Sequence, residues 1–204
     1  MIAGIFRNET LIYCFIVCFE SVFVSAMEQS SGIIIRLTKL TETSLIVHWC
    51  TEQDGFVKTV AKGARRPKSA FAGKLDLFFR GNLSWVRSRK GELHTLREVA
   101  ITDYGENLRK QYTDVLVASY FGELFSHVVE PDHPVPELYD LLRRGIAYLG
   151  ENGADLRALK HYESEMARLL GVANRRASAR RALENTYGNL PRSRQACIEA
   201  MSGF

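Results

Sequence analysis

The sequence predicts a mixed α+β fold in which a small β-barrel precedes a helical domain. In the first half of the chain, short apolar runs rich in β-branched and aromatic residues alternate with turn residues, as in antiparallel β-structure. In the second half, apolar residues recur at the spacing of helices. A length of 204 residues and a hydrophobic content of 46% leave room for one or two small globular domains.

The predicted strands lie close together between residues 32 and 101. They comprise residues 32–37, 45–49, 56–61, 75–80, 83–87 and 93–101. The Asp54-Gly55 pair between the second and third runs is typical of a hairpin turn. Because no pattern of helical length separates these strands, they indicate a small antiparallel barrel or sandwich. The length fits an OB-like barrel of about five or six strands.

The second half is predicted to be helical throughout. Asp103 and Glu106 resemble a capping box that starts a long helix over residues 106–129. The Pro-rich segment 130–136 ends this helix, and Pro136 suits the first position of the next one. Further helices are predicted at 156–170, 174–186 and 191–201. We therefore expect an N-terminal extension at residues 1–26, an OB-fold nucleic-acid-binding domain at 27–105 and a helical domain at 106–204.

Positive charge is concentrated in the predicted barrel. Residues 27–105 hold 13 Lys and Arg against 8 Asp and Glu, whereas residues 106–204 hold 13 of each. Within the barrel, segment 58–90 contains a single acid, Asp76, and ten basic residues. These are Lys58, Lys62, Arg65, Arg66, Lys68, Lys74, Arg80, Arg87, Arg89 and Lys90. Such a concentrated field indicates a polyanionic partner.

Nucleic acid is the polyanion that this segment suits best. Lys and Arg side chains that neutralise phosphates release condensed counterions, which drives sequence-independent binding. Aromatic rings interleaved with the charges suit stacking on unpaired bases; they are Phe71, Phe78, Phe79 and Trp85. The alternative is that these rings fill the barrel core and that strand residues such as Lys58 and Arg87 are simply solvated. The loop from Lys62 to Lys68 favours nucleic acid more clearly, because its like charges need a counter-anion.

No motif for catalysis or metal binding is present. The sequence lacks a phosphate-binding glycine loop, a nucleophile elbow and paired zinc ligands. The four cysteines lack C-x-x-C spacing, which predicts a reducing compartment and no disulfide framework; they are Cys14, Cys18, Cys50 and Cys197. Acids and histidines also gather around the Pro-rich segment; they are His127, Glu130, Asp132 and His133. We interpret this segment as a solvated loop and not as a metal site. The sequence therefore predicts a binding protein, with no catalytic residue and no metal ligand.

The first 26 residues mimic a secretory signal. Apolar residues from Leu11 to Val24 follow Arg7 and end at Ser25-Ala26, but Glu20 interrupts them and the run is too short to span a bilayer comfortably. Taken alone, the segment favours a signal peptide. Because Met27 directly precedes the foldable pattern, and because a protein that acts on chromosomal DNA cannot be exported, we interpret residues 1–26 as an upstream extension of the start site. This predicts a cytoplasmic, nucleoid-associated protein without membrane contact, the alternative being export on a true signal.

Several segments resemble the N-terminal domain of the RecO family. They are residues 32–37, Thr41–Val47, and Val60–Ser69 with its basic K-G-A-R-R run, followed by Phe71-Ala72-Gly73. The resemblance covers about residues 27–170 and is strongest in the first half. It implies an OB-fold and a helical domain that bind single- and double-stranded DNA and anneal complementary strands. It also implies partnership with RecR and with the C-terminal tail of single-strand-binding protein, so that RecA can be loaded in gap repair.

The resemblance also maps the family's basic surface onto this sequence. It assigns nucleic-acid binding to Lys62, Arg65, Arg66, Lys68 and Lys74, to which the charge pattern adds Lys58, Arg87 and Arg89. Many members carry a four-cysteine zinc module after the helical region, whereas residues 172–204 contain only Cys197 and an Arg-rich segment, so we expect no zinc cofactor. That segment predicts a second polyanion contact or an exposed basic helix. The alternative function is a scaffold that docks RecR or another repair protein without binding DNA itself.

Overall fold

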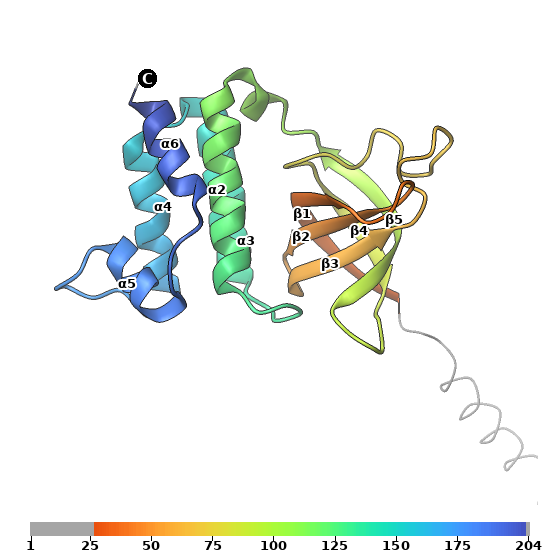
Figure 1. The fold of residues 1–204 in the computed structure, drawn as a ribbon, viewed down its shortest axis with the longest axis horizontal. Coiled ribbons are helices and arrows are strands. Elements are labelled where there is room, and N and C mark those ends of the chain that lie inside the picture. Colours follow the sequence, from red (N-terminus) through yellow and green to blue (C-terminus); the bar gives the residue numbers. More distant parts are fainter. Residues whose placement is uncertain (1–26, 203–204) are drawn as a thin grey trace, which may run out of the picture.

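The computed structural model describes residues 27–202, in which a closed five-stranded barrel is followed by a 3-10 helix and five α-helices (Figure 1). The strands are β1 (Met27–Lys39), β2 (Leu45–Thr51), β3 (Gly55–Ala61), β4 (Arg80–Val86) and β5 (Leu93–Asp103). The helices are η1 (Glu106–Lys110), α2 (Tyr112–Val128), α3 (Pro136–Asn152), α4 (Leu156–Leu169), α5 (Ala179–Tyr187) and α6 (Ser193–Met201). The fold is α+β, with an OB-type barrel followed by a helical domain, as the sequence predicts.

The interpretation of residues 1–26 as a start-site extension lies outside the described residues and stays a prediction. Within residues 27–202, no helix combines the length and the apolar character needed to cross a bilayer.

The barrel closes because β1 is long enough to pair with two neighbours. Its residues Met27–Ile33 pair with β4, and its residues Gly32–Lys39 pair with β2. The strand order is β1-β2-β3-β5-β4, antiparallel except for the parallel contact between β3 and β5. The close approach of β5 to β4 requires glycine at Gly81, where an added Cβ would lie 2.4 Å from the carbonyl oxygen of Ala100.

The barrel interior is filled by alternating strand residues, which settles the role of most of the aromatic residues. Trp49 and Trp85 are fully buried, and the indole Nε1 of Trp49 donates to the Thr59 hydroxyl at 2.9 Å. Phe71 is buried in the barrel interior as well, whereas Phe78 is buried in the cluster that joins the barrel to the helices. Three of the four aromatic residues of the basic segment therefore serve the core, and Phe79 alone is half-buried.

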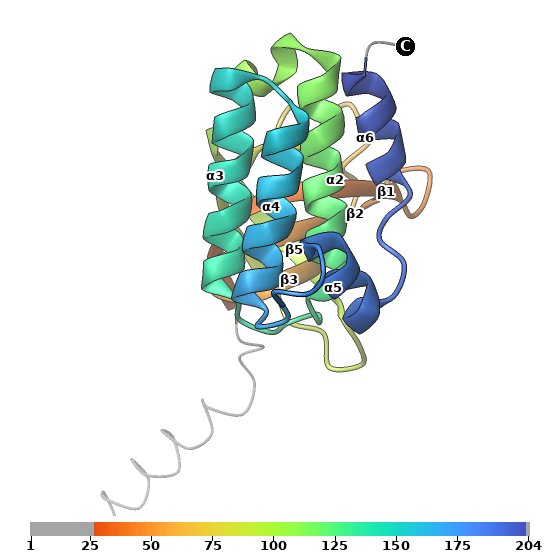
Figure 2. The ribbon, with the colours of Figure 1, turned by 90° about the vertical axis from the view of Figure 1, so that its left-hand side faces the viewer.

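A second core joins the barrel to the helices. Ile33, Ile35 and Phe56 of the barrel pack in one cluster with Leu124 and Phe125 of α2. Helices α2 and α3 face the barrel, and α4 packs against α3 on the side away from it (Figures 1 and 2), with α6 against α2 and α5 against α4. The close approach of α2 to β1 depends on Gly122, because an added Cβ there would lie 3.0 Å from the Cβ of Ile35.

Two predicted elements have different boundaries in the structure. Residues 75–79, predicted as strand, are irregular with a turn at 77–78, because the Asp76 carboxylate accepts the Leu77 N–H at 2.8 Å and Phe78 adopts a left-handed φ of 62°. The helix predicted at 106–129 divides into η1 and α2 at the extended residue Gln111. The predicted capping box does not form, because Asp103 accepts the N–H of Gly105 instead of capping a helix.

The prediction of a solvated Pro-rich loop is wrong for its middle residues. The Asp132 N–H donates to the carbonyl oxygen of Phe56 at 3.0 Å, and Pro131 forms a bridge with the same residue of β3. His133 is exposed, but its carbonyl oxygen lies where a side chain at Gly55 would be. The loop between α2 and α3 therefore docks on the barrel.

Candidate nucleic-acid interface

The loop between β3 and β4, residues 62–79 and here called the basic loop, carries five of the eight predicted nucleic-acid-binding residues. It is built from successive tight turns, such as Arg66 N–H to Gly63 oxygen and Ser69 N–H to Arg66 oxygen, each at 3.0 Å. The buried ring of Phe71 anchors it in the barrel core. The loop is thus an ordered platform that displays charges outward.

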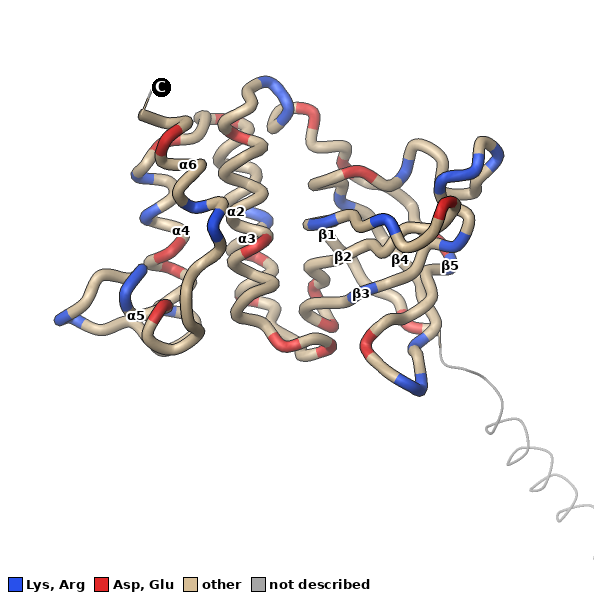
Figure 3. Tube along the Cα trace, viewed as in Figure 1, with Lys and Arg blue, Asp and Glu red and all other residues tan. Residues whose placement is uncertain are grey.

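The charges of the basic loop are almost uncompensated. Lys62, Arg65, Arg66 and Lys68 are exposed and Lys74 is half-buried, and none of the five forms an ion pair within residues 27–202. The Arg65 guanidinium donates to the Glu42 carbonyl at 3.0 Å, which holds the loop beside the β1–β2 turn. Figure 3 shows Lys and Arg gathered on this outer loop of the barrel. Such a cluster is the kind of surface that attracts a polyanion.

The three predicted residues outside the loop have different surroundings. Lys58 on β3 pairs with Glu92 at 2.8 Å and lies over the Phe56 ring. Arg89 is exposed in the β4–β5 loop. The Arg87 guanidinium contacts three carboxylates: Glu28 at 3.4 Å, Asp54 at 3.2 Å and Asp132 at 3.4 Å. Its positive charge is therefore balanced within the protein.

Sequence reasoning missed the buried His94, which completes the Arg87 cluster. Its Nδ1 accepts the N–H of Ser88 at 3.1 Å, so we assign the ring proton to Nε2, which donates to the Asp132 carboxylate at 2.8 Å. Burial is the main cause that raises the pKa of the neighbouring Asp54 carboxyl. The cluster fastens the Pro-rich loop to β5 and orders the hairpin that carries Arg89. No sequence pattern signals it, because its members come from four separate segments.

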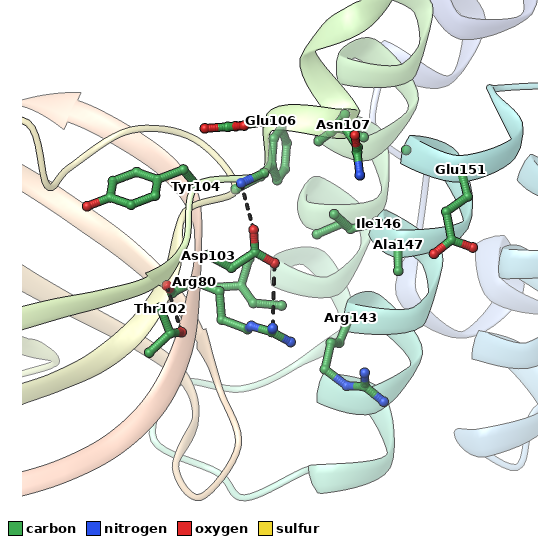
Figure 4. A pocket seen from close by; sticks show the side chains of 15 residues that line it. Arg80, Thr102, Asp103, Tyr104, Glu106, Asn107, Arg143, Ile146, Ala147 and Glu151 are labelled. Atoms are coloured by element: carbon green, nitrogen blue, oxygen red, sulfur yellow. Dashed lines mark hydrogen bonds and ion pairs between the residues drawn. The ribbon is translucent and has the colours of Figure 1, made fainter.

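A cleft of about 520 Å³ opens where the barrel meets α3. Figure 4 shows Arg80 on the barrel wall and Arg143 on the helical wall. Arg80 lies 3.5 Å from Asp103, and Glu106 and Glu151 also line the cleft. Its charges are therefore mixed, which makes it a poorer phosphate site than the basic loop.

A second cleft, of about 440 Å³, lies between α3 and α4 and has an apolar floor. The rings of Phe121 and Tyr162 stack there with centroids 3.8 Å apart. Gly145 permits this packing, since an added Cβ would lie 3.2 Å from the Phe121 ring. Basic side chains surround the floor; they are Arg144, Arg157 and His161.

The Arg-rich segment, residues 171–194, is not one exposed basic helix. The helix expected at 174–186 begins at Ala179, capped by Ser178, so Arg175 and Arg176 lie in the preceding turn. Arg194 is largely buried, and its Nε lies 2.6 Å from the carboxylate of Glu163. Part of this segment therefore serves the helical core.

A closed OB-type barrel with uncompensated positive charge on one ordered loop is typical of nucleic-acid-binding proteins. Residues 26–104 match the family described as "Recombination protein O N terminal". The barrel is thus similar to the N-terminal domain of the RecO family.

Curated relatives extend the similarity into the helical domain. The DNA repair protein RecO of Methylococcus capsulatus is 34% identical over 131 residues, which cover 64% of this chain and 52% of the relative. The proteins of that name from Chromobacterium violaceum and Syntrophus aciditrophicus are 31% and 26% identical over 148 residues, 72% of this chain and 58% and 57% of theirs. The chain thus spans somewhat more than half the length of these relatives.

Proposed function

We propose that this protein is a recombination mediator that binds single- and double-stranded DNA and anneals complementary strands without catalysing a reaction. The observation that carries the proposal is the set of exposed cations on the basic loop, which have no acidic partner within residues 27–202. Phosphates would supply the missing counter-charge, and released counterions would drive binding. We place Lys62, Arg65, Arg66, Lys68 and Lys74 at the centre of the DNA site, with Arg89 at its edge. Lys58 and Arg87 contribute less, because acids already pair with them.

The proposal includes the partners that the family implies. RecR would join the protein on DNA, and together they would help RecA to load in the cytoplasm, without a metal or other cofactor. The similarity to proteins named for DNA repair supports this assignment.

We place the tail of single-strand-binding protein in the cleft between α3 and α4. Such a tail is acidic and ends in hydrophobic residues, and the cleft pairs an apolar floor with a basic rim. Arg157 has no ion-pair partner within residues 27–202, whereas Arg144 is paired with Asp140 at 2.7 Å. Charge complementarity thus favours Arg157 as the first contact of the tail carboxylates.

The test of DNA binding is the anisotropy of labelled single-stranded DNA with the full chain across a salt series. Reversal of Arg65, Arg66 and Lys68 to Glu removes about three phosphate contacts. The slope of log affinity against log salt should then flatten by about two. A matched control reverses Arg175, Arg176 and Arg181, which are also exposed, and should leave the binding nearly unchanged.

Two results would contradict this assignment. If only the control reversal abolishes binding, the DNA site lies on the Arg-rich segment and not on the basic loop. If the wild-type chain binds no DNA at low salt, yet captures RecR in a nuclease-treated pull-down, the scaffold function replaces the mediator.

The tail site is tested with a synthetic acidic peptide that ends in apolar residues. Arg157→Glu should weaken peptide binding about tenfold or more, since a charge pair becomes a repulsion. The same variant should bind single-stranded DNA normally. If the affinity for the peptide is unchanged, the tail does not bind in this cleft.

A further inference from the structure

Phe79, Tyr104 and Arg109 form an aromatic shelf at the end of the basic loop. The Phe79 and Tyr104 rings meet edge to face, with centroids 5.0 Å apart and an interplanar angle of 83°. The guanidinium of Arg109 lies over the Phe79 ring at 5.1 Å. Tyr104 is 49% exposed, in contrast to the buried aromatic residues of the barrel.

The aromatic shelf is held in place from several sides. Arg109 donates to the carbonyl oxygen of Leu77 at 2.8 Å and lies 3.2 Å from the Asp76 carboxylate. The carbonyl oxygen of Phe79 accepts the Ile34 N–H at 3.0 Å, which ties the ring to β1. Gly105, with a left-handed φ of 62°, turns the chain directly after Tyr104. The rings are therefore pre-positioned, and binding a ligand on them requires little ordering.

The position of the aromatic shelf relates it to the basic loop. Phe79 is the last residue of that loop, so the rings lie at the β4 end of the segment that carries the uncompensated cations. Figure 4 shows the Tyr104 side chain pointing away from the barrel–α3 cleft. The nearby cations form ion pairs with acidic side chains, Arg80 with Asp103 and Arg109 with Asp76. The shelf therefore offers ring surface and not net charge.

We propose that Tyr104, supported by Phe79, stacks on an unpaired base of single-stranded DNA whose phosphates are held by the basic loop. This inference rests on the proposed DNA-binding function. An edge-to-face pair leaves ring surface of the edge-presenting partner open, and every base has a face to stack on it. A duplex has no unstacked base to offer. The aromatic shelf would thus distinguish single-stranded from double-stranded DNA, which the basic loop alone cannot do.

The first test compares Tyr104→Ala with Tyr104→Phe in the full chain, by anisotropy on an oligo-dT strand and on a duplex. Tyr104→Ala should weaken binding of the single strand about tenfold and leave duplex binding within about twofold, while Tyr104→Phe keeps the ring and the affinity. Tyr148→Ala is the matched control, because Tyr148 is 48% exposed but lines the α3–α4 cleft. It should bind both DNAs normally.

A Tyr104→Trp variant gives a direct signal for stacking. Trp49 and Trp85 are 0% exposed, so a third indole at position 104 would be the solvent-accessible one in the barrel. Its fluorescence should be quenched as oligo-dT saturates the protein. The corresponding Tyr148→Trp variant should show no such quenching.

The outcomes separate the aromatic shelf from the basic loop. If Tyr104→Ala binds the single strand normally while the basic-loop reversal abolishes binding, stacking at Tyr104 is refuted and the proposed function stands. Equal losses on single strand and duplex would also refute stacking. If the wild-type chain binds neither DNA, the proposed function itself fails.

Discussion

At the scale of single residues, charge burial in the helical core is the feature with the largest energetic consequence. Glu163 is 2% exposed, and its carboxylate accepts the Tyr120 hydroxyl at 2.6 Å and the Arg194 Nε at 2.6 Å. Burial, followed by the adjacent Glu163 charge, raises the pKa of Tyr120 well above its usual range. An ion pair in such a place is tolerated only while both partners remain.

Arg194→Met should lower the free energy of unfolding by about 3–5 kcal/mol, because it leaves Glu163 charged and unpaired in the core. Urea unfolding followed by circular dichroism measures the change. The double variant Glu163→Gln with Arg194→Met should recover part of the loss. Strictly additive effects of the two substitutions would show that the pair is not coupled.

His48 gives the protein an acid-sensitive stability. Burial is the main cause that lowers its pKa from 6.5 to about 4, with further contributions from the positive charges of Arg36 and Lys58. The unfolded chain therefore takes up a proton below pH 6.5 that the folded protein does not accept until about pH 4. This contribution to stability is complete above pH 6.5 and declines as the pH falls toward 4.

The measurement is the urea midpoint of wild type and His48→Gln at pH about 7.5 and about 5. Wild type should lose more stability between the two values than the variant, because glutamine has no proton to take up. Equal losses would assign the acid sensitivity to other groups.

At the scale of elements, the Pro-rich loop shows how strongly tertiary contacts decide conformation. Its sequence ends one helix and starts the next, as its prolines predict. Its docking on β3 depends on Gly55, which has a φ of +67° and an ideal Cβ position only 1.9 Å from the His133 oxygen. Tertiary contacts matter in the basic loop as well. Its turn residues predict an irregular backbone, but they do not predict that the Phe71 side chain is buried in the barrel core.

Gly55→Ala should detach the Pro-rich loop, because the new methyl group would overlap the backbone of His133. Hydrogen exchange should accelerate at the Asp132 amide, whose bond to Phe56 would be lost. Gly73→Ala is the matched control, because its φ of +70° imposes similar backbone strain while its Cβ meets nothing within 4 Å. Unchanged protection in Gly55→Ala would show that the loop adapts without detaching.

At the scale of the whole molecule, one hydrophobic core is shared by the barrel and the helical domain. Ile35 on β1 and Leu124 on α2 belong to the same buried cluster, and Gly122 brings the two elements together. Both tryptophans lie in the barrel, whereas most of the circular dichroism comes from the helices. The two signals therefore report on different halves.

We expect the tryptophan and circular dichroism signals to give the same denaturant midpoint, because loss of the shared core exposes both halves together. Gly122→Val should separate the midpoints by forcing α2 away from β1. Two distinct transitions in the wild-type chain would contradict cooperative unfolding.

The order of barrel and helices, the basic loop and the resemblance of the barrel to its family could all be predicted from the amino-acid sequence. These features follow from local patterns of apolar spacing, turn residues and charge, each of which extends over only a few residues. Three contacts could not be predicted and are visible only in the folded protein: Arg87 with three carboxylates, Asp132 with the buried His94, and Tyr104 with Phe79. Such contacts join residues far apart in the chain, and their energies depend on burial and geometry that no local pattern specifies.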